Sequence, residues 1–284
     1  MRYKKRTILL FLLPGLAGLL LFYLVPLLGG VYVSLTDGTR LNRYVGLINY
    51  RDVWDNAMFQ LGLKNTWIFA GICTPLSFLL SLLAALALAP IKKGGVFIKN
   101  SLFMPYLMPS SAILLIWLTV FDYGGAINRL MVLILGHRVD FLAGATLRVP
   151  IILLYLWKNV GFCSIIFTSA IQTVPRAYYE FAQLEGAGPL RTHWSVTLPC
   201  IAPTAYLVFI FSFMGAFKIF KEVYFIGGAY PDKAVYTLQN YMNNMYMKLN
   251  DQYVTAAAYL FALMVIVLFG VIFLLQRRVS ASED

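Results

Sequence analysis

Residues 180–203, EFAQLEGAGPLRTHWSVTLPCIAP, separate two hydrophobic runs and have the composition of helices more than of a loop. Pro175 suits the first turn of a helix, and Gly186 and Gly188 suit its end. Pro189 suits the start of a second short helix that we expect to end near Val196. The stretch therefore predicts a helix, a glycine corner and a second helix that lie outside the hydrocarbon core of a membrane.

The composition around this stretch is that of a membrane protein. The chain has 284 residues, of which 60% are hydrophobic and 12% are charged, and this is more apolar length than one soluble core can bury. The net charge of +11 comes with basic residues that flank apolar runs, where they meet lipid headgroups, so it argues against nucleic-acid binding. Cys73, Cys163 and Cys200 lack CxxC spacing and indicate neither a disulfide framework nor a metal site.

Six hydrophobic runs approach the roughly 20 residues that cross a bilayer. They cover approximately residues 7–28, 66–89, 101–121, 150–171, 201–220 and 254–275. The first run is longer than the apolar part of a signal peptide, so we expect a retained helix. The prediction is an all-α, polytopic membrane protein with six transmembrane helices. Its parts are 1–65 (N-terminal cytoplasmic tail, first helix and external loop), 66–276 (transmembrane domain) and 277–284 (cytoplasmic tail).

Basic residues predict the orientation of these helices. They gather before the first run, in the second connection and after the last run, at Arg2, Lys4, Lys5, Arg6, Lys92, Lys93, Lys99, Arg277 and Arg278. The loops on the other side, 36–65, 122–149 and 226–253, hold most of the acids. By the positive-inside bias, both termini and the 172–198 segment are expected in the cytoplasm.

The sequence offers little for catalysis. It has no HExxH, no GxSxG, no P-loop and no pair of intramembrane aspartates, so we expect neither an enzyme nor a catalytic or metal site. His137 and His193 both fall in predicted loops without a carboxylate or cysteine at ligand spacing.

Charged residues within or beside the spans suggest a solute pathway. A lysine at the bilayer centre costs about 2.5–3.5 kcal/mol, so such residues usually face a wet cavity or the bundle interior. Lys218 and Glu222 either form an i,i+4 ion pair at the water boundary or line the outer mouth of a pathway. The candidate pathway residues are Trp157, Lys158, Asn159, Phe217, Lys218, Phe220, Lys221 and Glu222.

The segment 236–246, YTLQNYMNNMY, has aromatic faces and amides of the kind that hold sugars. The same composition is typical of an external amphipathic connector, and a pattern alone rarely identifies a ligand. We therefore favour the connector interpretation.

The 172–203 stretch resembles the cytoplasmic loop of the permease subunits of binding-protein-dependent ABC importers, in the carbohydrate branch that includes the maltose-type membrane subunits. That loop reads approximately E-A-A-x-x-D-G-A followed by L-P. The residues that match are Glu180, Ala182, Gly186, Ala187, Gly188, Leu198 and Pro199, and the departures are Phe181, Glu185 and His193. Residues 44–54 with 63–71, and residues 217–241, also look like the first-permease type of this branch.

The resemblance implies the type I ABC importer permease fold, with a cytoplasmic coupling helix between helices 4 and 5. It places Glu180, Phe181, Ala182, Glu185, Gly186, Ala187, Gly188, Leu198 and Pro199 in the contact with an ATPase. The partners it implies are a second homologous permease, two ATP-binding subunits that hold ATP and Mg, an extracytoplasmic solute-binding protein, the lipid bilayer and a sugar or oligosaccharide. The implied location is the bacterial cytoplasmic membrane.

Two other functions stay open. A permease of the same superfamily for another solute, such as a glycerol phosphate, would gain from Lys158 and Lys218. A stand-alone secondary carrier is disfavoured because the spans hold no acidic residues and no inverted repeat is visible.

Overall fold

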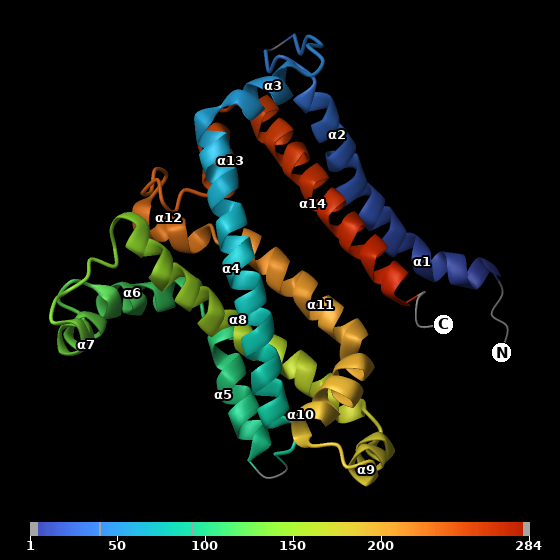
Figure 1. Ribbon diagram of the computed structural model, residues 1–284. Helices are drawn as coiled ribbons and strands as arrows, with labels where there is room; N and C mark the ends of the chain where they lie inside the picture. The colour runs from blue at the N-terminus through green and yellow to red at the C-terminus, as the bar shows by residue number, and fades with distance from the viewer. Residues whose placement is uncertain (1–4, 40, 92–93, 281–284) are drawn as a thin grey trace. The chain divides into compact units, whose positions relative to one another are not determined.

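The computed structural model describes residues 5–39, 41–91 and 94–280, with side chains described over 11–39, 41–91 and 94–272. Within these ranges the chain is helical, and apart from an isolated bridge between Thr36 and Tyr44 it has no strand (Figure 1). Six stretches are long and apolar enough to cross a membrane, which confirms the predicted six-span, all-α architecture. They are Phe11–Ser34, Ala57–Leu88, Ser110–Leu135, Gly144–Thr173, Pro189–Gly227 and Asp251–Ile272.

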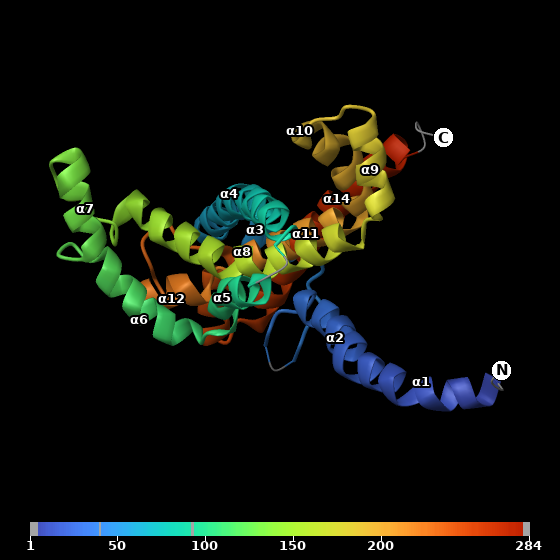
Figure 2. The same cartoon turned by 90° about the horizontal axis from the view of Figure 1, so that it is seen from below.

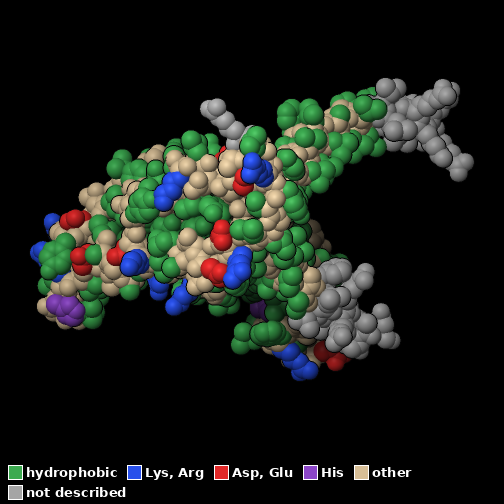
Figure 3. Space-filling model, turned by 90° about the horizontal axis from the view of Figure 1, so that it is seen from above, with side chains coloured by type: hydrophobic (Ala, Val, Ile, Leu, Met, Phe, Trp, Pro, Cys, Tyr) green, Lys and Arg blue, Asp and Glu red, His purple; other side chains and the backbone are tan. Residues whose placement is uncertain are grey.

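The chain forms two compact units, one of residues 1–60 with 241–284 and one of residues 61–240. The predicted sequential division at residues 65 and 276 stays a prediction. Figure 3 shows a face with many hydrophobic side chains, among which lysines, arginines and acids are scattered.

The first unit pairs the first span with the last. Helix α1 (Lys5–Leu19), the π-helical turn η1 (Leu20–Leu24) and helix α2 (Val25–Ser34) follow one another without a break. The widened turn closes with Val25 N–H donating to the Leu20 carbonyl just before Pro26, which has no N–H to continue the regular ladder. Helix α14 (Asp251–Ser280) packs against α2 and against α3 (Ile48–Asp55), and the Tyr259 hydroxyl donates to the Leu27 carbonyl.

The second unit is built around α8 (Arg148–Thr173), which follows the short 3-10 turn η2 (Gly144–Leu147). Helix α8 packs against α5 (Gly95–Leu107) and against α11 (Leu198–Phe217). Figures 1 and 2 both show α5 beside α8. Helix α4 (Ala57–Leu88) contributes to the same core, whose buried members are Ala85, Cys163, Phe167, Ile171, Val174, Ile201 and Val208. The α5–α8 approach is close at Gly161, where an added Cβ would collide with the Leu102 carbonyl oxygen.

The predicted third span, 101–121, is not one helix. Helix α5 ends at Leu107 and α6 (Ser110–Phe121) begins after Met108 and Pro109, whose ψ angles are 141° and 127°. The ring of a proline disfavours the helical conformation of the residue before it, so the break falls at Met108. Helix α7 (Ala126–Leu135) follows α6 after a short turn.

The predicted helix, glycine corner and helix are present, with different bounds. Helix α9 (Arg176–Leu184) begins after Pro175, which is its N-cap and does not lie in its first turn. Helix α10 (Pro189–Thr192) starts at Pro189 as predicted. It does not end near Val196, because the π-helical turn η3 (His193–Thr197) carries it directly into α11.

Two short helices complete the second unit and its boundary. Helix α12 (Lys221–Gly227) follows α11 after a break at Lys218, and α13 (Leu238–Met247) begins at the end of this unit. Asn65 in α4 donates to the carbonyls of Lys233 and Tyr236, at 2.8 and 2.9 Å, and so holds the segment before α13 in place.

Most of the basic residues that predict the orientation lie outside the part of the chain that the structure describes. Arg2, Lys4, Lys92 and Lys93 lie outside the described residues, as do the side chains of Lys5, Arg6, Arg277 and Arg278. The cytoplasmic position of both termini therefore stays a prediction.

Candidate functional site

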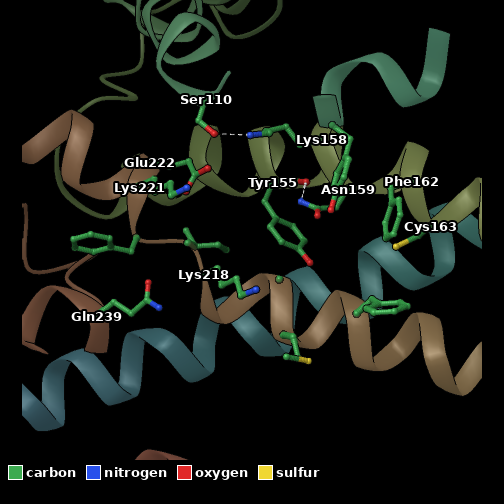
Figure 4. Close-up of a pocket in the computed structure, with 16 residues that line it drawn as sticks. Ser110, Tyr155, Lys158, Asn159, Phe162, Cys163, Lys218, Lys221, Glu222 and Gln239 are labelled. Atoms are coloured by element: carbon green, nitrogen blue, oxygen red, sulfur yellow. Dashed lines mark hydrogen bonds between the residues drawn. The ribbon is translucent and has the colours of Figure 1, made fainter. Parts of the chain in front are cut away.

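A cavity of about 720 Å³ lies in the second unit, between α8 and the segment where α11 gives way to α12 (Figure 4). This volume is in the range of small-molecule sites. Its walls come from α5, the start of α6, α8, α11, α12 and the start of α13. The lining residues are Tyr106, Ser110, Tyr155, Lys158, Asn159, Phe162, Cys163, Phe211, Met214, Gly215, Lys218, Ile219, Phe220, Lys221, Glu222 and Gln239.

Six of the eight candidate pathway residues line this cavity. Lys158 and Asn159 come from α8, and the other four are Lys218, Phe220, Lys221 and Glu222. Trp157 is not among the lining residues, since its ring stacks on Trp117 at 5.8 Å between centroids. Phe217 is also elsewhere and packs edge-on against Trp67 and Phe213.

Helical spacing explains why the walls converge. Tyr155, Lys158, Asn159 and Phe162 are at i, i+3, i+4 and i+7 of α8 and so share one face. The same spacing joins Phe211, Met214, Gly215 and Lys218 along α11 to its C-cap. This periodicity in the sequence could have revealed the lining residues that charge alone missed.

Hydrogen bonds hold the two walls together below the charged groups. The buried Tyr155 hydroxyl donates to the Ser212 carbonyl of α11 at 2.6 Å, and the Cys163 thiol lies 3.6 Å from the Ser212 hydroxyl. Asn159 Nδ2 donates to the Tyr155 carbonyl at 2.8 Å. The tyrosine therefore has a packing role, and the amide oxygen of Asn159 faces the cavity side of α8 (Figure 4).

Lys158 is the cation that α8 contributes to the cavity. It is half-buried, and its Nζ donates to the Ser110 hydroxyl at 2.7 Å, across the break between α5 and α6 (Figure 4). The break at Met108 thus exposes the start of α6 to α8. A hydroxyl partner leaves the lysine charge without a counter-ion, and this is costly at membrane depth unless water or a solute compensates it.

The alternative of an i,i+4 pair between Lys218 and Glu222 is wrong. Helix α11 ends at Phe217, the Phe220 N–H donates to the Lys218 carbonyl at 2.8 Å, and a new helix starts at Lys221. The two side chains are therefore not on one helix face. Over the described side chains, the only ion pair is Arg51–Asp55 at 3.7 Å. The cavity accordingly carries three lysines and one glutamate, none of them paired in this way.

Aromatic rings supply the apolar part of the lining. The rings of Tyr106 and Phe162 stack at 4.6 Å with a 10° interplanar angle, and Phe162 also meets Phe211 edge-on at 6.0 Å. Such flat faces suit the C–H surfaces of a polyol, while neighbouring lysine, amide and hydroxyl groups suit its oxygens. From the 236–246 segment, Gln239 alone lines the cavity, and Tyr236, Leu238 and Asn240 are buried.

A C-terminal capping motif ends helix α9 at Gly186, the corner of the 172–198 segment. The Ala187 N–H donates to the Ala182 carbonyl at 2.9 Å and the Gly186 N–H to the Gln183 carbonyl at 3.0 Å. Gly186 has φ +74° and nothing within 4 Å of an added Cβ. These are the two bonds of the Schellman motif, in which glycine adopts the left-handed conformation without steric cost.

The exposed surface of helix α9 is unexpectedly apolar. Phe181 and Leu184 of α9 are 65% and 87% exposed. Ala182 is buried within the chain, so its small side chain serves internal packing and does not lie on the surface as expected for docking. Of the other predicted contact residues, Glu180, Glu185, Gly186, Gly188 and Pro199 are exposed, and Ala187 and Leu198 are half-buried.

Over the described residues, no group of three or more His, Cys, Asp or Glu side chains is placed to hold a metal ion. Cys73 and Cys163 are buried and free, and Cys200 is exposed and free. The chemistry of the cavity is therefore that of hydrogen bonding, charge and stacking.

Comparison with known proteins places the chain in a family. Residues 77–281 match the family model described as "Binding-protein-dependent transport system inner membrane component". The chain is 27% identical to the diacetylchitobiose uptake system permease protein NgcF of Streptomyces coelicolor, over 97% of this chain and 83% of that protein. It is also 27% identical to the multiple sugar-binding transport system permease protein MsmF of Streptococcus mutans, over 96% and 95%.

The fold also matches a solved structure. One chain of a bacterial alginate ABC transporter, in complex with alginate pentasaccharide-bound periplasmic protein, superposes with a TM-score of 0.77 at 24% identity, covering 93% of both chains. The chain therefore belongs to the family of binding-protein-dependent transport system inner membrane components, and it is a transport subunit and not an enzyme.

Proposed function

We propose that this chain is the membrane-spanning subunit of an ATP-driven sugar uptake system and forms half of its translocation pathway. The observation that carries the proposal is the cavity around Lys158, which combines stacked aromatic faces with amide, hydroxyl and ammonium groups in a chain of this family. Sugars present this combination of C–H faces and hydroxyls. The sugar-uptake relatives NgcF and MsmF, which cover nearly the whole chain, support the solute class.

The complete transporter is proposed to contain four further proteins. They are a second homologous permease, two ATP-binding subunits that hold ATP and Mg, and an extracytoplasmic solute-binding protein. A periplasmic partner of this kind is present with the alginate transporter whose chain shares this fold. The proposed location is the cytoplasmic membrane of a bacterium, with both termini in the cytoplasm, because basic residues cluster at both ends and in the second connection.

The α9 corner is proposed to couple the chain to an ATP-binding subunit. The exposed Phe181 and Leu184 supply an apolar surface for a cleft in the partner. The buried Ala182 and the capped Gly186 fix the angle at which that surface is presented. Because η3 joins α10 to α11 without a break, movement of the corner would be transmitted along a continuous helix to the Lys218 side of the cavity, as alternating access requires.

An anionic solute, such as a glycerol phosphate, is the second candidate. It is favoured by one observation, the excess of lysine over glutamate in the cavity lining. A phosphate or carboxylate would supply the counter-ion that Lys158 lacks among the described residues.

The test is uptake into proteoliposomes that hold the complete complex with its solute-binding protein. We expect ATP-dependent uptake of a neutral oligosaccharide such as diacetylchitobiose or lactose, and no uptake without ATP. Uptake of sn-glycerol 3-phosphate in place of these sugars would select the second candidate. Transport by this chain alone, without ATP, would replace both with a secondary carrier.

A further inference from the structure

A second cavity, of about 840 Å³, lies in the same unit at the opposite ends of the helices and shares no lining residue with the first. It is formed by the end of α4, the start of α5, the end of α8, and α9 with His193 of η3. The lining residues are Leu86, Ala89, Pro90, Ile91, Gly95, Val96, Lys99, Ile171, Gln172, Val174, Arg176, Tyr179 and His193.

The charge of this lining has one sign. Lys99 and Arg176 contribute two cations, His193 contributes a further nitrogen donor, and no lining residue is acidic. Over the described side chains neither cation takes part in an ion pair. The electrostatic field of such a pocket favours an anion.

His193 is held with one nitrogen available. Its Nδ1 lies 3.2 Å from the Thr197 hydroxyl, and the Tyr179 hydroxyl lies 3.2 Å from the same oxygen. Thr197 is fully buried. When Tyr179 donates to Thr197 and Thr197 donates to Nδ1, the imidazole carries its proton on Nε2 as a free donor. His193 can thus act as a hydrogen-bond donor in the lining of this cavity.

The position of the cavity identifies the source of the anion. The spans Ala57–Leu88 and Gly144–Thr173 both end at this cavity, and α5 begins beside it at Gly95, so the cavity lies at the end of two spans, where they leave the hydrocarbon. Lipid phosphates lie at this depth, and basic pockets between transmembrane helices on the cytoplasmic side are suited to bind them. Val96 and the adjacent Phe97 are 73% and 76% exposed beside the pocket, as expected for contact with acyl chains.

We propose that this cavity binds the headgroup phosphate of an anionic phospholipid. Lys99, Arg176 and His193 contact the phosphate, and the apolar lining, including Ile91 and Val96, contacts the glycerol and the upper acyl chain. A free phosphate ion would leave that apolar lining unused, so the lipid is the better occupant. The bound lipid would join α5 to the start of α9. The proposed lipid site does not depend on which solute the transporter carries.

The test uses the purified transporter complex in phosphatidylcholine nanodiscs that contain a minor share of phosphatidylglycerol. Retained phosphatidylglycerol is counted by native mass spectrometry for the wild type, for Lys99→Gln with Arg176→Gln, and for a matched control, Lys64→Gln with Arg138→Gln, whose cations are exposed and outside both cavities. We expect the wild type and the control to retain the lipid and the test variant to retain about tenfold less, since two charge-assisted contacts are lost.

A second variant, His193→Phe, removes the Nε2 donor with little change in volume. We expect it to reduce retention while the complex still assembles in the yield of the wild type. Equal retention in the two double variants would overturn the proposal. Displacement of the lipid by inorganic phosphate would overturn it in favour of a free-anion site. Loss of the ATP-binding subunit from the Lys99→Gln and Arg176→Gln variant, with lipid retention unchanged, would overturn it in favour of a protein contact.

Discussion

Lys158 is the lining lysine whose hydrogen-bond partner the structure defines. Its Nζ bonds to Ser110 and has no acidic partner among the described residues, so its charge is available to a solute oxygen. We predict that Lys158→Met lowers ATP-dependent uptake about tenfold, because a hydrogen bond from a charged group contributes roughly 1.5–3 kcal/mol. Initial uptake rates in proteoliposomes measure the effect.

The control for Lys158→Met is Lys64→Met. Lys64 is an exposed cation of α4 that lies outside both cavities. The control variant should transport as the wild type does. Both proteins should assemble with their partners in equal yield. Unchanged uptake by Lys158→Met would remove this residue from the pathway.

Gly186 has a conformational role that a substitution can test. Its φ of +74° lies in the left-handed region, although its surroundings have room for a side chain. Replacing it by valine should cost about 1–2 kcal/mol or more through the backbone alone. We predict that Gly186→Val uncouples ATP hydrolysis from uptake, because the corner no longer presents Phe181 and Leu184 at the same angle.

The matched control is Gly186→Asn, since asparagine tolerates the left-handed conformation. The ratio of solute transported to ATP hydrolysed should stay near that of the wild type. If valine and asparagine lowered the ratio equally, bulk at this position and not its backbone conformation would be responsible.

At the scale of elements, the contact between α5 and α8 sets the position of Tyr106 over Phe162. The contact is close because Gly161 has no Cβ to collide with the Leu102 carbonyl. Gly161→Ala must push the two backbones apart, so we predict destabilisation of roughly 1–3 kcal/mol, as for other overpacked sites. Thermal unfolding of the purified complex in detergent is the measurement.

Gly71→Ala in α4 is the control, since an added Cβ there has nothing within 4 Å. Alanine also has the higher helix propensity, so this variant should be as stable as the wild type or slightly more stable. A Gly161→Ala variant as stable as Gly71→Ala would contradict the close packing of α5 on α8.

For the whole molecule, the predicted orientation places α9 and the α7 end on opposite sides of the membrane. Glu180 and Arg138 are both exposed. With Cys200, the exposed native thiol, replaced by serine, Glu180→Cys should react with a membrane-impermeant maleimide in inside-out vesicles. Arg138→Cys should react in intact cells whose outer barrier is permeable to the reagent. The reverse pattern would invert the topology.

The sequence by itself determined the number of spans, the α9 corner and the four charged residues of the cavity lining. Apolar length, Gly186 with Pro189, and intramembrane lysines are local signals whose physical meaning does not depend on distant residues. The sequence also indicated the family through the spacing from Glu180 to Pro199. This motif lies in one continuous stretch, so its recognition requires no knowledge of contacts between distant residues.

Only the tertiary structure decided which faces meet. It ended α11 at Phe217 and so separated Lys218 from Glu222, it brought Ser110 to Lys158 across the break at Met108, and it buried Ala182. It also gathered Lys99, Arg176 and His193 from three separate segments into one basic cavity. The break at Met108 is a local effect of Pro109. The meeting of Ser110 with Lys158 and the gathering of the basic cavity depend on contacts between helices far apart in the chain, which no single segment specifies.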